Sequence, residues 1–229
     1  MAARVPVPVT LLLLAALALQ VGYHAARAPQ QRAVAGLAPA PPLAVLRLAS
    51  LGEPVVLAKA MTLYVQGQDE ASTPLGTIDY SALRTWLERI VDLDPRGQAP
   101  LLAASQVYSA SSDPARTRIM LDFVYRRFGE DPGRRWPWLA HAALVAHHRL
   151  HDPALARRYA HALNATAAVV PAWARQMELF ILDDMGEDES ATALIGAMLA
   201  GGQVSDPREL AFLERRLHDI SARRRRAHP

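Results

Sequence analysis

Histidines are the side chains of this sequence best suited to bind a metal or transfer a proton, and five of the eight lie in one stretch of the chain. They are His141, His147, His148, His151 and His161. His147 and His151 are four positions apart, a spacing with which two histidines on one helix clamp a metal ion. His151 directly precedes Asp152-Pro153, where a helix is expected to have ended, and no glutamate completes an HExxH motif. We therefore expect solvated or turn-capping histidines, with a metal site or acid–base catalysis as alternatives.

Acidic side chains form a second cluster around Gly186. Its members are Asp183, Asp184, Glu187, Asp188 and Glu189. The last three would occupy the first turn of a helix, where the helix dipole stabilises each negative charge by about 0.3–1 kcal/mol. The cluster predicts helix capping and solvation, with a hard cation or a basic partner as alternatives.

The segment Arg134-Arg135-Trp136-Pro137-Trp138 combines two arginines and two tryptophans at the expected entry of a helix. Arginine and tryptophan dominate the residues that contribute most to protein–protein binding. We predict that Arg134, Arg135, Trp136 and Trp138 contact a protein partner. The alternative is a hydrophobic staple, in which Trp136 covers the helix start.

Four consecutive arginines, Arg223, Arg224, Arg225 and Arg226, follow the last expected helix. Such a run attracts phosphates of lipid head groups or of nucleic acid. No aromatic residues are interleaved with it, which argues against nucleic acid. We predict a frayed basic tail over residues 223–229, with contact to anionic lipid or an acidic partner as the alternative.

No motif of a known catalytic chemistry is present: the sequence contains no GxSxG elbow, phosphate loop or dinucleotide-binding GxGxxG. The absence of cysteine excludes a disulfide scaffold and zinc or iron–sulfur sites built on thiolates. The hydrophobic fraction of 51% excludes a disordered chain. We expect a protein that is not an enzyme and holds no cofactor.

The amino terminus is an uncharged segment from Val5 to Tyr23 that contains the run LLLLAALAL. At a rise of about 1.5 Å per residue, its length approaches the hydrocarbon core of a bilayer. We predict a single-pass anchor within residues 1–28, with the bulk of the chain in the periplasm. A cleaved signal peptide or a soluble core helix are the alternatives. Residues 29–42, rich in alanine and proline, predict a semi-stiff linker.

From residue 43 to 222 the chain predicts helices joined by short turns, because alanine, leucine and arginine are strong helix formers and strand alternation is lacking. Asp113-Pro114, Asp152-Pro153 and Asp206-Pro207 each combine an N-cap acid with a proline suited to the first turn. Asp94, Asp131 and Val170 precede prolines every 37 to 39 residues and mark helix ends. The predicted helices cover residues 43–50, 54–66, 79–92, 98–110, 114–128, 136–150, 153–166, 171–185, 187–200 and 207–221.

Apolar residues pair seven positions apart on the first helix of each predicted hairpin. The pairs are Leu57 with Tyr64, Leu101 with Tyr108, Trp138 with Val145, and Trp173 with Phe180. Helical hairpins of this length with such anchors and a closing proline resemble the tetratricopeptide repeat, best in LERIVDLDPRGQAPLLAASQVYS. The period is longer and more variable than in that family, so the units are degenerate.

The order of anchor, linker and hairpins is similar to uncharacterised membrane-anchored repeat proteins of proteobacteria. This resemblance implies an all-α fold, with a transmembrane helix followed by a tetratricopeptide-like superhelix whose abundant alanines let paired helices pack closely. It implies a scaffold. The anchor, the linker and the hairpins together predict a scaffold or adaptor that binds a protein partner, with an envelope complex as its expected setting. A metal-binding accessory protein and a purely structural subunit of a membrane assembly are the alternative functions.

Overall fold

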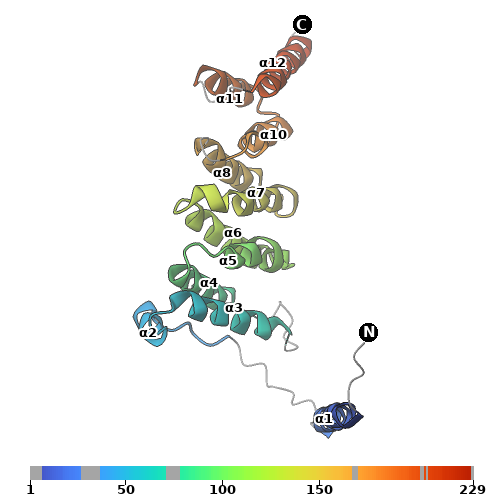
Figure 1. Ribbon diagram of the computed structural model, residues 1–229. Coiled ribbons are helices and arrows are strands. Elements are labelled where there is room, and N and C mark those ends of the chain that lie inside the picture. Colours follow the sequence, from blue (N-terminus) through green and yellow to red (C-terminus); the bar gives the residue numbers. More distant parts are fainter. Residues whose placement is uncertain are drawn as a thin grey trace. The chain divides into compact units, whose positions relative to one another are not determined.

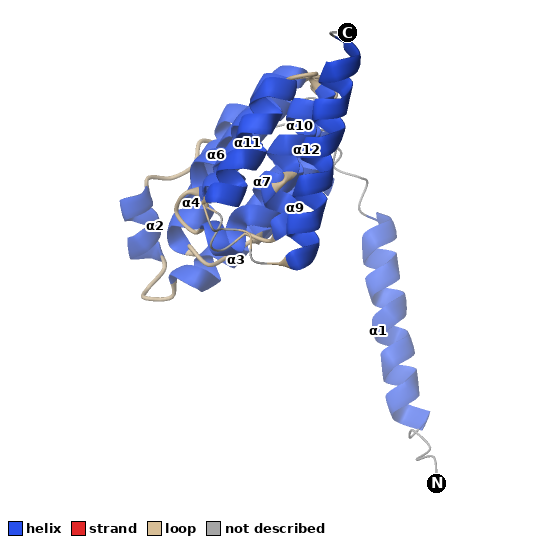
Figure 2. Cartoon of the chain, turned by 90° about the horizontal axis from the view of Figure 1, so that it is seen from above, coloured by secondary structure: helices blue, strands red, loops and turns tan. Residues whose placement is uncertain are grey.

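The computed structural model describes residues 7–26, 37–70, 78–166, 170–201, 204 and 206–227, and every regular element among them is helical (Figures 1 and 2). By its contacts the chain divides into two units, Met1–Ala35 and Gly36–Pro229. The prediction of an all-α protein is thus confirmed for the described residues. Residues 29–36 of the predicted linker lie outside them, as do residues 71–77 between the helices predicted over 54–66 and 79–92.

The amino-terminal unit contains one helix, α1 (Val7–Ala26), which agrees with the helix expected from the uncharged segment. Its described apolar side chains are solvent-exposed. Among the residues that the structure describes, no helix combines the length and hydrophobicity needed to cross a membrane. The transmembrane span expected from the sequence is therefore without support in the structure.

The second unit is a series of helical hairpins stacked in chain order (Figure 1). It opens with α2 (Leu43–Ala49) and closes with α12 (Pro207–Ala227). The first helices of the hairpins are α3 (Pro54–Glu70), α5 (Ala99–Leu102) continued by η2 (Ala103–Val107) and η3 (Tyr108–Ala110), α7 (Pro132–His148), and α9 (Ala172–Arg175) continued by α10 (Met177–Asp184). Their partners are α4 (Tyr80–Leu93), α6 (Pro114–Phe128), α8 (Pro153–Ala165) and α11 (Asp188–Ala200).

The three predicted aspartate caps are present. The Asp113 carboxylate accepts from the Ala115 amide at 2.9 Å, and Asp152 accepts from Leu155 at 2.9 Å. Asp206 accepts from Arg208 at 2.8 Å. A fourth cap, at Asp79, lacks the following proline and was not predicted from the sequence.

Three predicted boundaries are wrong. Helix α3 continues to Glu70 instead of ending at residue 66, since the glutamines and acids there are compatible with a helix. Helix α7 begins at Pro132 instead of residue 136, because the Arg134 and Arg135 amides bond to the Asp131 carbonyl. Helix α12 extends to Ala227, so residues 223–227 are helical and the predicted boundary of a basic tail at residue 223 is incorrect.

Small residues explain how closely α7 and α8 pack. Ala142, Ala143 and Ala146 on α7 are fully buried, as are Ala156 and Ala160 on α8. Without side chains beyond Cβ, the two helix backbones approach each other closely around larger residues such as Tyr159. The buried core has two parts, one from Leu46 to Ile181 and a second shared by α10, α11 and α12.

We expect Asp152→Ala to lower the free energy of unfolding by about 1 kcal/mol, because the cap of α8 is lost. Hydrogen bonds from the Leu155 amide and from Arg118 lower the pKa of Asp152. A lowered pKa in the folded state contributes stability above the ordinary aspartate pKa of about 3.9, and this contribution disappears as the pH falls below that value. Urea unfolding at pH 7 and at pH 3 should therefore show a smaller difference between variant and wild type at the lower pH. An equal difference at both pH values would contradict the assignment.

Candidate protein-interaction groove

Helices α7 and α10 are the first helices of consecutive hairpins, and contacts between residues 37 positions apart join the two hairpins at both ends. At one end, Trp136 meets the α9 residue Trp173 edge to face, with ring centroids 5.4 Å apart. At the other end, His147 Nε2 lies 2.9 Å from Asp184 Oδ2. These two contacts hold α7 beside the last hairpin, and a groove runs between them along α7 and α10.

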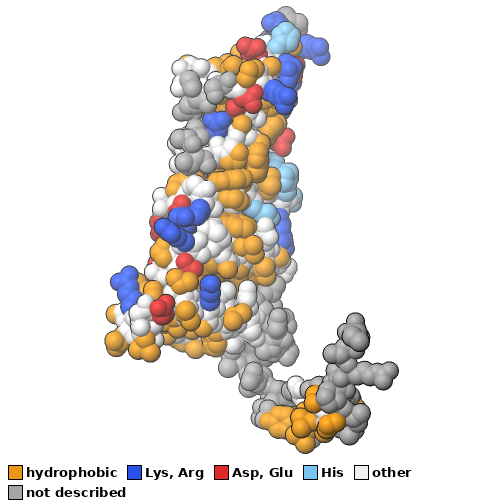
Figure 3. All heavy atoms as spheres, in the orientation of Figure 1, with side chains coloured by type: hydrophobic (Ala, Val, Ile, Leu, Met, Phe, Trp, Pro, Cys, Tyr) orange, Lys and Arg blue, Asp and Glu red, His pale blue; other side chains and the backbone are white. Residues whose placement is uncertain are grey.

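The α7–α10 groove has a volume of about 210 Å³. It is lined by Ala143, Leu144, His147, His148, Met177, Phe180, Ile181 and Asp184. Leu144 and Phe180 are 45% and 43% exposed, large fractions for apolar side chains of this size. Figure 3 shows histidines beside hydrophobic side chains on the drawn face of this unit. The groove is therefore an apolar surface with polar groups, mainly His147, His148 and Asp184, at its edge.

The groove side of the last hairpin is formed by Trp173, Phe180 and Asp184, which are spaced seven and four positions apart on one helix face. Trp173 is 55% exposed, and Phe180 contacts Phe212 of α12 with ring centroids 5.9 Å apart. Both residues, which the sequence pattern pairs at seven positions, are more than two-fifths exposed. Leu101 and Tyr108, the equivalent pair of an earlier hairpin, are buried. Trp173 and Phe180 are exposed instead, because Ala174, Met177 and Leu179 fill the core of the last hairpin.

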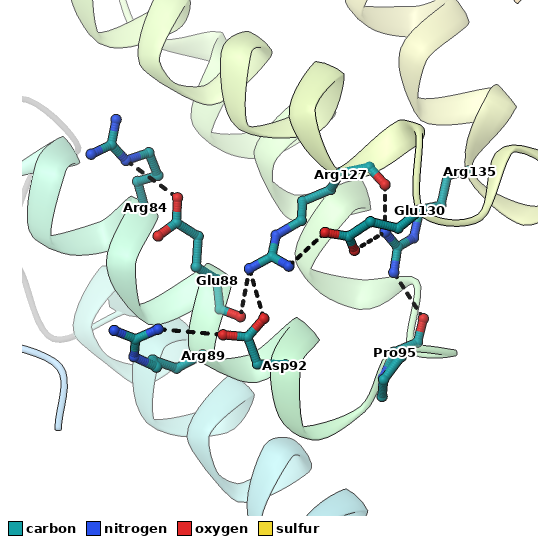
Figure 4. A network of polar contacts seen from close by, with 8 residues as sticks. All are labelled: Arg84, Glu88, Arg89, Asp92, Pro95, Arg127, Glu130 and Arg135. Atoms are coloured by element: carbon teal, nitrogen blue, oxygen red, sulfur yellow. Dashed lines mark hydrogen bonds and ion pairs between the residues drawn. The ribbon is translucent and has the colours of Figure 1, made fainter. Parts of the chain in front are cut away.

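Arg135 occupies a different environment from the one predicted. Its side chain is 1% exposed and donates hydrogen bonds to the carbonyl oxygens of Arg127 and Pro95, the latter at 2.9 Å (Figure 4). It also pairs with Glu130 at 2.6 Å. A buried guanidinium with these partners holds the α6–α7 turn against the turn after α4. The prediction that Arg135 contacts a partner is wrong, because no donor edge reaches the surface.

Arg127 extends this network toward α4. It donates to Glu130 Oε1 at 2.9 Å and to Asp92 Oδ1 at 2.8 Å (Figure 4). Burial favours a raised pKa for Glu130, but hydrogen bonds and charges of Arg135 and Arg127 outweigh it and lower the pKa of Glu130. The network therefore joins the α6–α7 turn to the end of α4 and the turn after it through charged groups, and the sequence alone did not identify Arg127 or Glu130 as its members.

The other predicted contact residues lie nearer the surface. Arg134 pairs with Asp131 at 2.6 Å, and its side chain is 53% exposed. Trp136 is half-buried against Trp173. Trp138 is half-buried, and its Nε1 donates to Gln98 Oε1 at 2.7 Å. Trp136 thus belongs to the groove end, whereas the indole donor of Trp138 serves the contact between two hairpins.

The five clustered histidines do not gather at one point, although the rings of His147 and His148 meet edge to face with centroids 4.6 Å apart. His147 pairs with Asp184, His161 lies 3.1 Å from the Glu178 carboxylate, and His151 has a φ of 50° after the end of α7. The helical spacing between His147 and His151 is therefore lost. Across the residues that the structure describes, no group of three or more His, Asp or Glu side chains is placed to hold a metal ion.

The acidic cluster and the terminal arginines meet one another. Asp183 accepts from Arg216 and Arg223, and Asp188 accepts from Arg223 at 2.9 Å. Hydrogen bonds to Asp183 and Asp188 raise the pKa of Arg223. Arg223 therefore attaches α12 to α10 and α11, a correction to its prediction as a lipid or partner contact. Arg225 and Arg226 are exposed, and the side chain of Arg224 lies outside the described residues.

Comparison of the chain with models of known protein families, with curated proteins and with solved structures finds no match. The groove must therefore be interpreted from its own geometry. In the sequence, the seven-residue spacing of Trp173 and Phe180 pointed to part of this groove, whereas no pattern singled out Leu144.

Proposed function

We propose that this chain is a helical-repeat scaffold that binds a protein partner in the α7–α10 groove and is attached to a membrane by α1. The observation that carries the binding proposal is the pair of exposed apolar side chains, Leu144 and Phe180, beside a groove of about 210 Å³. Exposed apolar surface bordered by polar groups is typical of protein-interaction sites. The resemblance to tetratricopeptide repeats supports the same function.

The groove favours a partner of defined chemistry. Its apolar floor accepts a large aliphatic or aromatic side chain, and the Asp184 carboxylate, 62% exposed at one end, favours a basic group next to it. Trp136 and Trp173 supply a rigid aromatic border at the other end. The proposed occupant is a peptide segment that carries a large apolar residue followed by lysine or arginine.

Attachment through α1 rests on its composition and exposure. The helix contains no Asp, Glu, Lys or Arg, and the described Leu12, Leu17 and Leu19 are 70%, 56% and 78% exposed. Such side chains gain free energy when they leave water for a lipid environment. Flotation of the whole chain with phospholipid vesicles tests this attachment.

A photo-crosslinking amino acid at position 180 should capture a protein partner in cells, and the same group at position 102 should not. Leu102 is the matched control because it is an apolar residue, 39% exposed, on the first helix of another hairpin. With the captured partner purified, Phe180→Asp and Leu144→Asp should each weaken binding at least tenfold, since a charge would replace an apolar contact at the centre of the interface.

Melting temperatures of these variants provide the folding control. Equal affinity of wild type, Phe180→Asp and Leu144→Asp for the partner would refute the groove as its binding site. Equal losses for Leu102→Asp and Phe180→Asp would show that the partner recognises exposed apolar residues without using the groove.

A further inference from the structure

The amino-terminal end of the repeat unit exposes a second apolar surface, which we call the apolar tip. It comprises Val45 and Leu48 of α2, Leu51 of the following turn, and Val56 and Leu63 of α3, which are 54%, 80%, 91%, 63% and 69% exposed. Figure 3 shows hydrophobic side chains gathered over this end of the unit. Single exposed leucines are common, but five apolar residues at these exposures on two consecutive helices and the turn between them indicate a contact surface.

Leu51 has a backbone conformation that is unusual for a leucine. Leu51 has a φ of 50° and the next residue, Gly52, a φ of 91°. A residue with a Cβ is disfavoured in this left-handed region, where glycine or asparagine is normal. Both the left-handed conformation of Leu51 and its 91% exposure therefore lower the stability of the folded chain. A contact outside the described chain would compensate for both costs.

The charged residues of the tip are mainly basic. Arg47 and Lys59, the single lysine of the chain, are exposed and form no ion pair with a described residue, and Glu53 is the acidic neighbour in sequence. Leucine and valine flanked by cations are typical of surfaces that enter the boundary between head groups and acyl chains of anionic bilayers. The side chains protrude, so a protein partner would need a matching cavity, whereas a lipid surface adapts to them.

Residues 27–42 connect the end of α1 to the start of α2 and extend at most about 55 Å. We propose that the apolar tip inserts Leu48 and Leu51 into the surface of an anionic bilayer and so orients the repeat unit on the membrane. This inference rests on the proposed attachment of α1 and adds to it a second, separate lipid contact.

The absence of cysteine permits a direct test. A single cysteine is introduced as Leu51→Cys, labelled with an environment-sensitive fluorophore, and the full chain is mixed with phosphatidylcholine vesicles that contain phosphatidylglycerol and a lipid-linked quencher. The label should shift to the blue and lose at least half of its emission. The matched control Ala197→Cys, an exposed position on α11, should show neither change.

A second variant separates lipid contact from folding. Leu51→Asn relieves the left-handed conformation, so its melting temperature should equal or exceed that of wild type. A fluorophore at Leu48→Cys should nevertheless lose at least half of its quenching in the Leu51→Asn background. Unchanged quenching at position 48 in this background would overturn the role of Leu51.

Flotation in the same vesicles distinguishes the two proposals. A chain that floats while the label at position 51 stays in water contradicts the tip and leaves the α1 attachment standing. A chain that does not float contradicts both. A blue shift that appears without vesicles and grows with protein concentration would assign the tip to contacts between copies and overturn the lipid proposal.

Discussion

Replacing Arg135 by methionine should lower the free energy of unfolding by about 3 kcal/mol, because the loss of one partner of a buried ionic network leaves the others unsatisfied. Methionine preserves most of the side-chain volume but donates no hydrogen bond. The Pro95 and Arg127 carbonyls would lose their guanidinium donor, and Glu130 would lose its contact at 2.6 Å. Urea-induced unfolding followed by circular dichroism measures the change.

The neighbouring arginine provides the control for this prediction. Arg134→Met removes the same charge one position earlier, but Arg134 is 53% exposed and pairs among described residues with Asp131, three positions before it. An exposed ion pair contributes about 0–1 kcal/mol, so this variant should unfold close to wild type. Equal destabilisation by the two substitutions would disprove the special role of Arg135 at the turn between hairpins.

Replacing Glu209 by leucine should be the second large effect. Glu209 stands in the first turn of α12, is 7% exposed, and accepts from Arg175 at 3.2 Å and from Gln176 at 3.1 Å. Removing the carboxylate leaves the Arg175 charge buried without this counter-ion, which costs about 3 kcal/mol. Because α12 shares the smaller core with α10 and α11, the loss should concentrate at the carboxyl end.

Native-state hydrogen exchange measures this second effect by region. In Glu209→Leu the amides of α11 and α12 should exchange faster by roughly two orders of magnitude, while those of α4 and α6 change little. Glu214→Leu is the matched control, since Glu214 is exposed on the same helix. Faster exchange spread evenly over all hairpins would contradict a locally acting ion pair.

The sequence predicted the order of the helices and most of their ends because these depend on neighbouring residues. Asp113, Asp152 and Asp206 accept from amides two or three residues later, so their caps follow from local chemistry. Helix α7 shows the limit of this reasoning. Asp131-Pro132 was interpreted as the end of the preceding helix, yet α7 begins at Pro132 and includes Pro137 near its first turns.

The contact residues could not be assigned from the sequence with the same success. Arg134 and Arg135 are identical in type and adjacent, and both were predicted to face a partner, yet one is exposed and the other buried. The terminal arginines show the same difficulty, since Arg223 reaches back to Asp183 and Asp188. Residue type indicates what a side chain can bind, while the fold decides whether a partner within the chain binds it first.

By itself the sequence determined an all-α chain with an uncharged amino-terminal segment and a stack of hairpins, because helix propensity, caps and seven-residue spacing act within one or two turns. Only the tertiary structure decided which residues form the groove and the buried network. Arg135 reaches Pro95 across 40 positions, and His147 reaches Asp184 across 37. Such pairs depend on how successive hairpins stack, and stacking is set by many small buried contacts that no local motif specifies.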